Sequence, residues 1–216
     1  MKKFLLFAFV VTTALTSCNK NYNTPTPTSG KIGTDTAVTI GGEVYPVIQI
    51  GGQSWTAVNY RGPGGIYNTG TGQQNLLQGK LYTPLEATQI SIPTGWRIPT
   101  YGDILTLLIT RGATKNSDGT YSAGLPVAHS LMSTSGWSEG GGNNYSKFNA
   151  LSTGFYHLGV FYGSGNGASF LHSLVAGSAP DQGFMIGPGP DGQPLIFFGL
   201  GLDDGDACSI RFVKDN

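Results

Sequence analysis

The chain has 216 residues, of which 12 are basic and 12 acidic, so its formal net charge is zero. Only 11% of the residues are charged, so nothing in the composition indicates the basic surface that a nucleic-acid-binding protein needs. It also contains 34 glycines and 10 tyrosines, a mixture typical of short strands joined by many turns.

Residues 1–17 predict a lipoprotein signal peptide. Two lysines precede an apolar run, and small residues lead to a cysteine. Leu15-Thr-Ser-Cys18 resembles a bacterial lipobox, in which the cysteine is lipidated and becomes the first residue of the mature chain. The run is shorter than the roughly 20 apolar residues that span a bilayer, so a transmembrane anchor is the weaker alternative. We therefore expect a membrane anchor attached through Cys18.

Residues 18–37 predict a flexible tether, because they are polar and carry prolines among threonines. The remaining residues, 38–216, suffice for one domain with its own core. With Cys18 lipidated, Cys208 has no partner for a disulfide within the chain. We expect Cys208 to be a small buried apolar side chain.

The domain opens with a predicted three-stranded meander. Alternating segments over 38–40 and 43–50 flank Gly41 and Gly42, and a second pair of glycines precedes a strand over 53–58. Residues 61–78 are rich in glycine and poor in aliphatic side chains. They predict a long surface loop.

Two segments carry signals for the start of a helix. Thr83-Pro-Leu-Glu86 offers a threonine N-cap, a proline in the first turn and a glutamate at the third position, which predicts a short helix to about residue 89. Thr100 with Asp103 predicts a second helix. Apolar residues follow at helical spacing from Ile104, and Gly112 marks the end.

The second half of the chain predicts one short helix and several strands. The helix is expected over 126–132. The strands are expected over 154–160, 169–176, 184–186, 195–199 and 207–213.

Several of these segments resemble the Fibrobacter succinogenes major paralogous domain (FISUMP) family of secreted and lipid-anchored Bacteroidetes proteins. Pro93-Thr-Gly-Trp-Arg-Ile-Pro-Thr100 is similar to the family's Pro-Thr/Ser-Gly-Trp-His/Arg-Leu/Ile-Pro-Thr/Ser element. The meander up to Arg61 resembles the family's opening, and Ser209-Ile-Arg-Phe-Val-Lys-Asp215 its close. The resemblance covers about 43–216. The Arg-Ile-Pro-Thr phrase is also similar to one in formylglycine-generating-enzyme-like domains.

The resemblance implies an α+β, C-type-lectin-like fold. It would have two main helices packed on small, mainly antiparallel sheets, long glycine-rich loops, and adjacent N- and C-terminal strands. It also implies an outer-membrane lipoprotein, on either the cell surface or the periplasmic face. Asp35-Thr36-Ala37 is similar to a tripeptide that Bacteroidetes glycosylate on oxygen, so Thr36 is a candidate O-glycosylation site.

The chain departs from the family at two positions. Where members commonly have cysteines, this chain has Ile92 and Phe212. If the family bridges those positions, the two side chains should pack against each other here. Buried apolar area would then replace a covalent constraint of roughly 2–4 kcal/mol.

Candidate ligand-binding residues lie in or beside predicted loops. Their side chains suit adaptable polar contacts and flat stacking faces, as in carbohydrate or protein recognition. They are Asn143, Asn144, Tyr145, Tyr156, His157, Tyr162 and Asn166. The alternative is that these residues only occupy turns of a glycine-rich chain.

Asp203, Asp204 and Asp206 offer the density of carboxylate oxygens that calcium prefers. Their spacing is not that of an EF-hand loop, and a solvated acidic turn is the alternative. C-type-lectin-like domains often hold calcium in loops, so the resemblance keeps calcium as a candidate. We expect no other cofactor.

We therefore expect a lipid-anchored envelope protein that displays a binding or adhesion domain and is not an enzyme. Its ligand would be a glycan or another envelope protein. One alternative is a structural or assembly subunit, such as a pilus-tip protein. Another is an envelope polysaccharide-processing enzyme, which would need paired carboxylates about 5–10 Å apart. That enzyme is disfavoured because Glu43 and Glu86 fall in predicted secondary structure.

Overall fold

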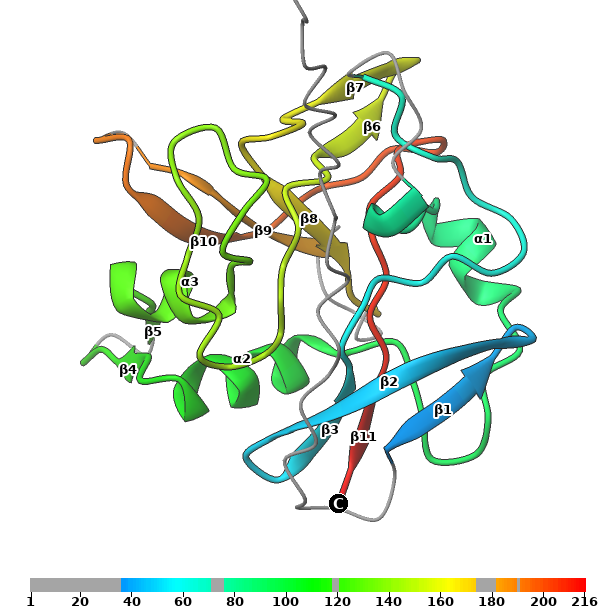
Figure 1. Ribbon diagram of the computed structural model, residues 1–216, viewed down its shortest axis with the longest axis horizontal. Coiled ribbons are helices and arrows are strands. Elements are labelled where there is room, and N and C mark those ends of the chain that lie inside the picture. The colour runs from blue at the N-terminus through cyan, green and yellow to red at the C-terminus, as the bar shows by residue number, and fades with distance from the viewer. Residues whose placement is uncertain (1–35, 71–75, 118–120, 174–181, 190) are drawn as a thin grey trace, which may run out of the picture.

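The computed structural model describes residues 36–70, 76–117, 121–173, 182–189 and 191–216. The predicted signal peptide, Cys18 and most of the tether lie outside these ranges. The described residues form three α-helices and four antiparallel sheets, which confirms the expected α+β class. The largest sheet and the β6–β7 hairpin lie at opposite ends of the molecule (Figure 1).

The first and last strands share one sheet. Its order is β1-β2-β3-β11, and its strands are β1 (Ala37–Ile40), β2 (Glu43–Ile50), β3 (Gln53–Thr56) and β11 (Val213–Asp215). Gly41 and Gly42 turn between β1 and β2 with φ of 58° and 84°, which glycine adopts without strain. Val213 of β11 lies opposite Trp55 of β3. The predicted meander is confirmed. The last strand joins the same sheet as the first described strands, but its neighbour is β3, and β1 lies at the opposite edge.

The first two helices begin at their predicted caps, and the third begins one residue before its predicted start. They are α1 (Pro84–Thr88), α2 (Tyr101–Thr110) and α3 (Leu125–Leu131). Thr83 and Glu86 form a capping box at α1, and Thr100 and Asp103 form one at α2. Each cap stabilises its helix by about 1 kcal/mol, because it satisfies backbone N–H groups that have no partner inside the helix.

Two hydrophobic clusters form the core. In the first, the apolar stripe of α2 packs with Trp55 and Phe148. The second contains Tyr45, Tyr60, Tyr82, Cys208 and Phe212, and Ile92 packs against it. Phe212 and Ile92 therefore belong to the same cluster. Cys208 is fully buried as expected, and this burial raises the pKa of its thiol to about 12.

The remaining strands form three smaller sheets. They are β4 (Thr114–Lys115) with β5 (Tyr121–Ser122), β6 (Phe155–His157) with β7 (Val160–Tyr162), and β8 (Ala168–Leu171), β9 (Gly183–Pro188) and β10 (Pro194–Phe198). The single strand expected over 154–160 is wrong. Leu158 and Gly159 have φ of 47° and 86°, so the chain turns back there as a hairpin. Residues 174–176 of the expected strand over 169–176 lie outside the described ranges.

The expected surface loop over 61–78 is partly buried. It includes a short 3-10 helix, η1 (Leu76–Gln78). Asn68 is 7% exposed, and its side-chain amide donates to the Thr153 carbonyl and to Ser164 Oγ. Ile66 pairs with Leu81. These contacts fasten the loop to the body of the domain.

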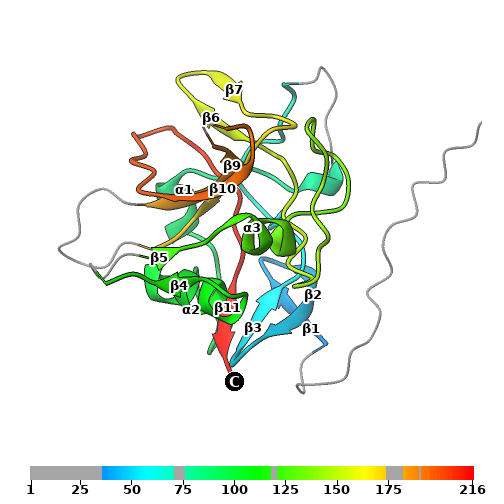
Figure 2. The same ribbon diagram turned by 90° about the vertical axis from the view of Figure 1, so that its left-hand side faces the viewer.

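The strand expected over 207–213 is also wrong, because regular pairing begins only at Val213. Residues 206–212 are buried and cross the middle of the molecule between the sheets (Figures 1 and 2). Ala207, Cys208 and Ser209 each bridge to a different neighbour, which prevents a continuous ladder.

Arg211 anchors this crossing segment although it is 1% exposed. Its guanidinium donates to Asn59 Oδ1 at 2.6 Å, to the Thr56 carbonyl at 2.8 Å and to the Asn149 carbonyl at 3.2 Å. It also lies 4.8 Å from the ring centroid of Phe148. Burial lowers the pKa of Arg211 to about 9, so the side chain stays charged at neutral pH.

Candidate functional site

A hollow of about 350 Å³ lies between α3, the loop over 137–142 and the turn that joins β9 to β10. Its lining combines an aromatic ring, amides, carboxylates, an imidazole and a thioether. These side chains belong to Trp137, Asn166, Gln193, Glu139, Asp191, His129 and Met132. We call this hollow the Trp137 pocket.

Glycines shape the α3 side of the Trp137 pocket. A Cβ atom on Gly142 would lie 2.3 Å from the His129 carbonyl oxygen, and one on Gly141 would lie 2.4 Å from the backbone of Thr134. Only glycine lets the loop fold this closely onto α3. The indole N–H of Trp137 donates to Ser133 Oγ at 3.0 Å, which orients the ring.

Short turns shape the opposite side. In the β9–β10 turn, the Gln193 N–H donates to Asp191 Oδ1 at 3.0 Å, and the Gly189 N–H donates to the Gln193 carbonyl at 2.7 Å. Asn166 sits in a turn closed by its N–H to the Gly163 carbonyl at 2.9 Å. Two segments distant in sequence thus contribute polar residues to the pocket that Trp137 lines.

The structure places the predicted ligand-binding residues in three regions. Asn143, Asn144 and Tyr145 lie in the loop after residue 142, and Tyr156, His157 and Tyr162 lie on the β6–β7 hairpin. Asn166 alone of the set lines the Trp137 pocket.

Asn143 and Asn144 hold their own loop together. Asn143 Oδ1 accepts from the Tyr145 N–H at 3.1 Å, and Asn144 Oδ1 accepts from the Asn149 N–H at 2.9 Å. Tyr145 is 80% exposed. These bonds agree with the alternative given above, in which Asn143 and Asn144 occupy turns and do not contact a ligand.

Sequence analysis missed Trp137, Glu139, Asp191 and Gln193 as members of one site. Trp137 sits in a serine- and glycine-rich segment with almost no other apolar residue nearby. That isolation is the one signal in the sequence that could have indicated a tryptophan held for contact with a ligand.

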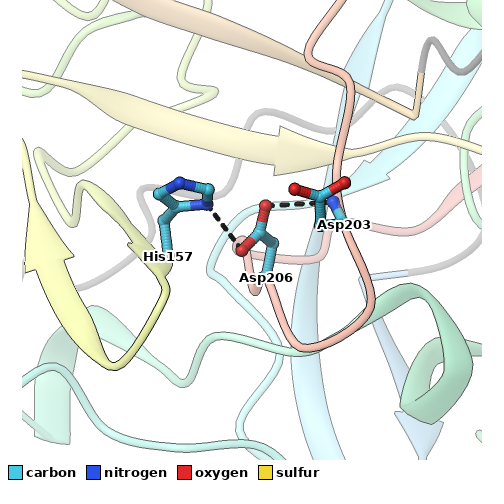
Figure 3. A group of neighbouring side chains, drawn as sticks. All are labelled: His157, Asp203 and Asp206. Carbon is cyan, nitrogen blue, oxygen red and sulfur yellow. Dashed lines mark hydrogen bonds and ion pairs between the residues drawn. The ribbon is translucent and has the colours of Figure 1, made fainter.

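A second group joins residues that the sequence predicted separately. Ligand atoms of His157, Asp203 and Asp206 lie within 4.8 Å of one another (Figure 3). His157 Nδ1 lies 2.8 Å from Asp206 Oδ1, and Asp206 Oδ2 accepts from the Asp203 N–H at 3.0 Å. Asp204 is exposed and is not a member of this group.

The group adds an imidazole nitrogen to two of the carboxylates that the sequence predicted for calcium. An imidazole nitrogen with two carboxylates is typical of zinc and related transition metals, whereas calcium prefers oxygen ligands alone. The existing bonds also give the group a structural role, because they link β6 to the turn before the crossing segment.

We expect Asp206→Ala to destabilise the protein by about 1–3 kcal/mol, because it removes the partner of His157 Nδ1 and the acceptor of the Asp203 N–H. Chemical denaturation in the presence of EDTA measures this loss. Asp204→Ala is the matched control and should change stability by less than about 0.5 kcal/mol. Equal losses for the two variants would contradict the structural role of the His157–Asp206 contact.

The β6–β7 hairpin carries exposed apolar side chains. Leu158 is 77% exposed, Val160 50% and Tyr162 44%. Phe155 and Tyr162 stack with ring centroids 5.6 Å apart. Clustered exposed apolar side chains are a feature of surfaces that contact other proteins.

No match to this chain is found among protein-family models, curated proteins or solved structures. Within the described ranges, none of the helices has the length and apolar character that crossing a membrane requires. Thr36 is exposed next to β1, and its O-glycosylation stays a prediction.

Proposed function

We propose that this chain is a lipid-anchored outer-membrane protein, on the cell surface or the periplasmic face, whose domain serves binding or adhesion. The lipobox ending at Cys18 supports the anchor. The small antiparallel sheets and the pairing of β11 with β3 support a C-type-lectin-like fold of FISUMP type. The domain would stand away from the membrane on the tether.

The proposed ligand is a glycan bound in the Trp137 pocket. One observation carries this proposal, namely that Trp137 shares a hollow of about 350 Å³ with the side chains of Asn166 and Gln193. Sugar rings present apolar faces that stack on aromatic rings, and their hydroxyl groups bond to amides and carboxylates. The volume falls at the lower end of the roughly 300–1,000 Å³ typical of small-molecule sites.

Binding fits this pocket better than catalysis does. Glu139 and Asp191 line the same hollow, as the alternative of a polysaccharide-processing enzyme would require. Both residues are exposed, however, whereas a catalytic acid usually needs burial to hold its proton at neutral pH. Release of reducing sugar from a bound glycan would favour the enzyme.

The test is a glycan array probed with the full chain in detergent. We expect Trp137→Ala to weaken glycan binding at least about tenfold, equivalent to about 1.4 kcal/mol. Asn166→Ala should also weaken binding. This substitution changes no residue of the hydrophobic core. Tyr145→Ala is the control, because it removes an exposed aromatic ring outside the pocket and should leave binding unchanged.

Absence of glycan binding by the folded protein would contradict the proposal. So would a loss of binding in Tyr145→Ala with none in Trp137→Ala.

A structural or assembly subunit is the second candidate, and the exposed apolar hairpin favours it. Leu158 and Val160 offer a contact surface that has no role in a sugar site. Replacing both by serine should abolish capture of an envelope protein if this function holds, and should leave glycan binding unchanged if the Trp137 pocket is the functional site.

A further inference from the structure

The charge of the Trp137 pocket indicates which glycans it accepts. Glu139 from the loop after α3 and Asp191 from the β9–β10 turn both line it. No lysine or arginine occurs among its described lining residues, and His129 is the one basic side chain there. The pocket therefore has two carboxylates and no permanent positive charge.

Among the described residues, neither carboxylate forms an ion pair with a lysine, arginine or histidine. Asp191 accepts one backbone hydrogen bond, from Gln193, through Oδ1. Its second oxygen has no hydrogen bond within the described ranges.

From this charge we infer that the Trp137 pocket binds neutral or amine-bearing sugars and rejects sugars that carry a carboxylate, sulfate or phosphate. The inference rests on the proposed glycan-binding function and names its ligand class. An anionic sugar placed against Trp137 would face two like charges with no arginine or lysine to pair with it. Sugar hydroxyl groups, in contrast, can donate hydrogen bonds to both carboxylates.

An amine-bearing sugar gains two further contacts. Its ammonium group can pair with Glu139 or Asp191, and it can lie over the indole face of Trp137, the aromatic ring that attracts cations most strongly. We therefore expect amine-bearing sugars to bind more tightly than their neutral counterparts at low ionic strength, and this advantage should shrink as salt is added.

The experiment measures binding of the full chain in detergent to a panel of oligosaccharides. Each neutral member has an amine-bearing and a uronic acid counterpart of the same linkage and length. The inference predicts that the uronic acid members bind at least about tenfold more weakly than the neutral ones. Uronic acid members that bind as tightly as neutral ones would overturn it while leaving glycan binding intact. If no member binds, the proposed function itself is wrong.

A double variant tests whether the carboxylates cause the selectivity. Glu139→Gln with Asp191→Asn keeps the shape of both exposed side chains and removes their charge. We expect this variant to bind uronic acid members about as well as neutral ones and to lose the advantage for amines. A double variant that is folded by circular dichroism and still rejects uronic acid members would overturn the inference.

Discussion

Arg211→Ala is expected to destabilise the protein by roughly 3–5 kcal/mol. The guanidinium is buried, and its removal would leave Asn59 Oδ1 and the carbonyls of Thr56 and Asn149 without their donor. It would also leave a cavity beside Phe148. Urea denaturation followed by circular dichroism measures the change.

Two further variants show whether the loss of stability comes from losing any arginine, from losing the positive charge, or from losing the buried guanidinium. Arg61→Ala removes an arginine whose side chain is 45% exposed and 3.6 Å from Glu43, and should change stability by less than about 1 kcal/mol. Arg211→Lys keeps the charge but lacks the planar fork of donors, so it should recover only a minor part of the loss. Equal stability of the Arg61→Ala and Arg211→Ala proteins would show that the buried network contributes nothing.

Asp103→Asn is expected to cost about 2–4 kcal/mol at neutral pH. Asp103 is 6% exposed and accepts from Arg97 Nη2 at 2.6 Å, from Gln53 Nε2 at 2.8 Å and from the Thr100 N–H at 2.8 Å. The substitution removes the negative charge that pairs with Arg97. It also replaces one of the two acceptor oxygens at the start of α2 by an NH2 group, which cannot accept.

The loss from Asp103→Asn should depend on pH. Burial by itself raises the pKa of Asp103, but hydrogen bonds from Arg97 and Thr100 outweigh it and hold the pKa below its ordinary value of 3.8. The stabilisation is therefore fully present above about pH 5 and is lost as the pH falls through the lowered folded pKa. Denaturation curves should show the difference between wild type and variant shrinking below about pH 4.

Asp215→Asn serves as the control for this pH dependence. Asp215 also pairs with Arg97, at 2.9 Å, but its side chain is 68% exposed. Its substitution should cost less than about 1 kcal/mol. A constant difference between wild type and Asp103→Asn from pH 7 to pH 3 would contradict the lowered pKa.

Features that depend on a few consecutive residues could be predicted from the sequence. Thr83 with Glu86 and Thr100 with Asp103 predicted both capping boxes, because a cap joins groups only three residues apart. Gly41 and Gly42 likewise predicted the first hairpin turn. In each case the side chain or backbone that decides the structure lies within the same short segment.

Features that depend on tertiary contacts could not be predicted in this way. The sequence predicts one strand over residues 207–213, yet Ala207, Cys208 and Ser209 each bridge to a different neighbour. The Trp137 pocket also depends on tertiary contacts, because Trp137 and Asp191 line one hollow only when the β9–β10 turn packs beside α3. The sequence around Trp137 does not indicate Asp191 as a neighbour, and the sequence around Asp191 does not indicate Trp137.

The group of His157, Asp203 and Asp206 shows an intermediate case. The sequence marked His157 as a ligand-binding candidate and the aspartates as calcium candidates, but it gave no reason to combine them. Their contact requires β6 to pair with the crossing segment through Tyr156 and Ala207. Residue types could be predicted here, and their arrangement could not.

The indole N–H signals of the three tryptophans give the most direct measurement of the glycan-binding site. Trp55 and Trp96 are buried, at 0% and 9% exposed, whereas Trp137 is half-buried and lines the pocket. During titration of ¹⁵N-labelled protein with a glycan that binds, we predict a saturable shift of the Trp137 signal and little change in the other two. Binding that saturates while the Trp137 signal stays in place would contradict the assignment of the Trp137 pocket.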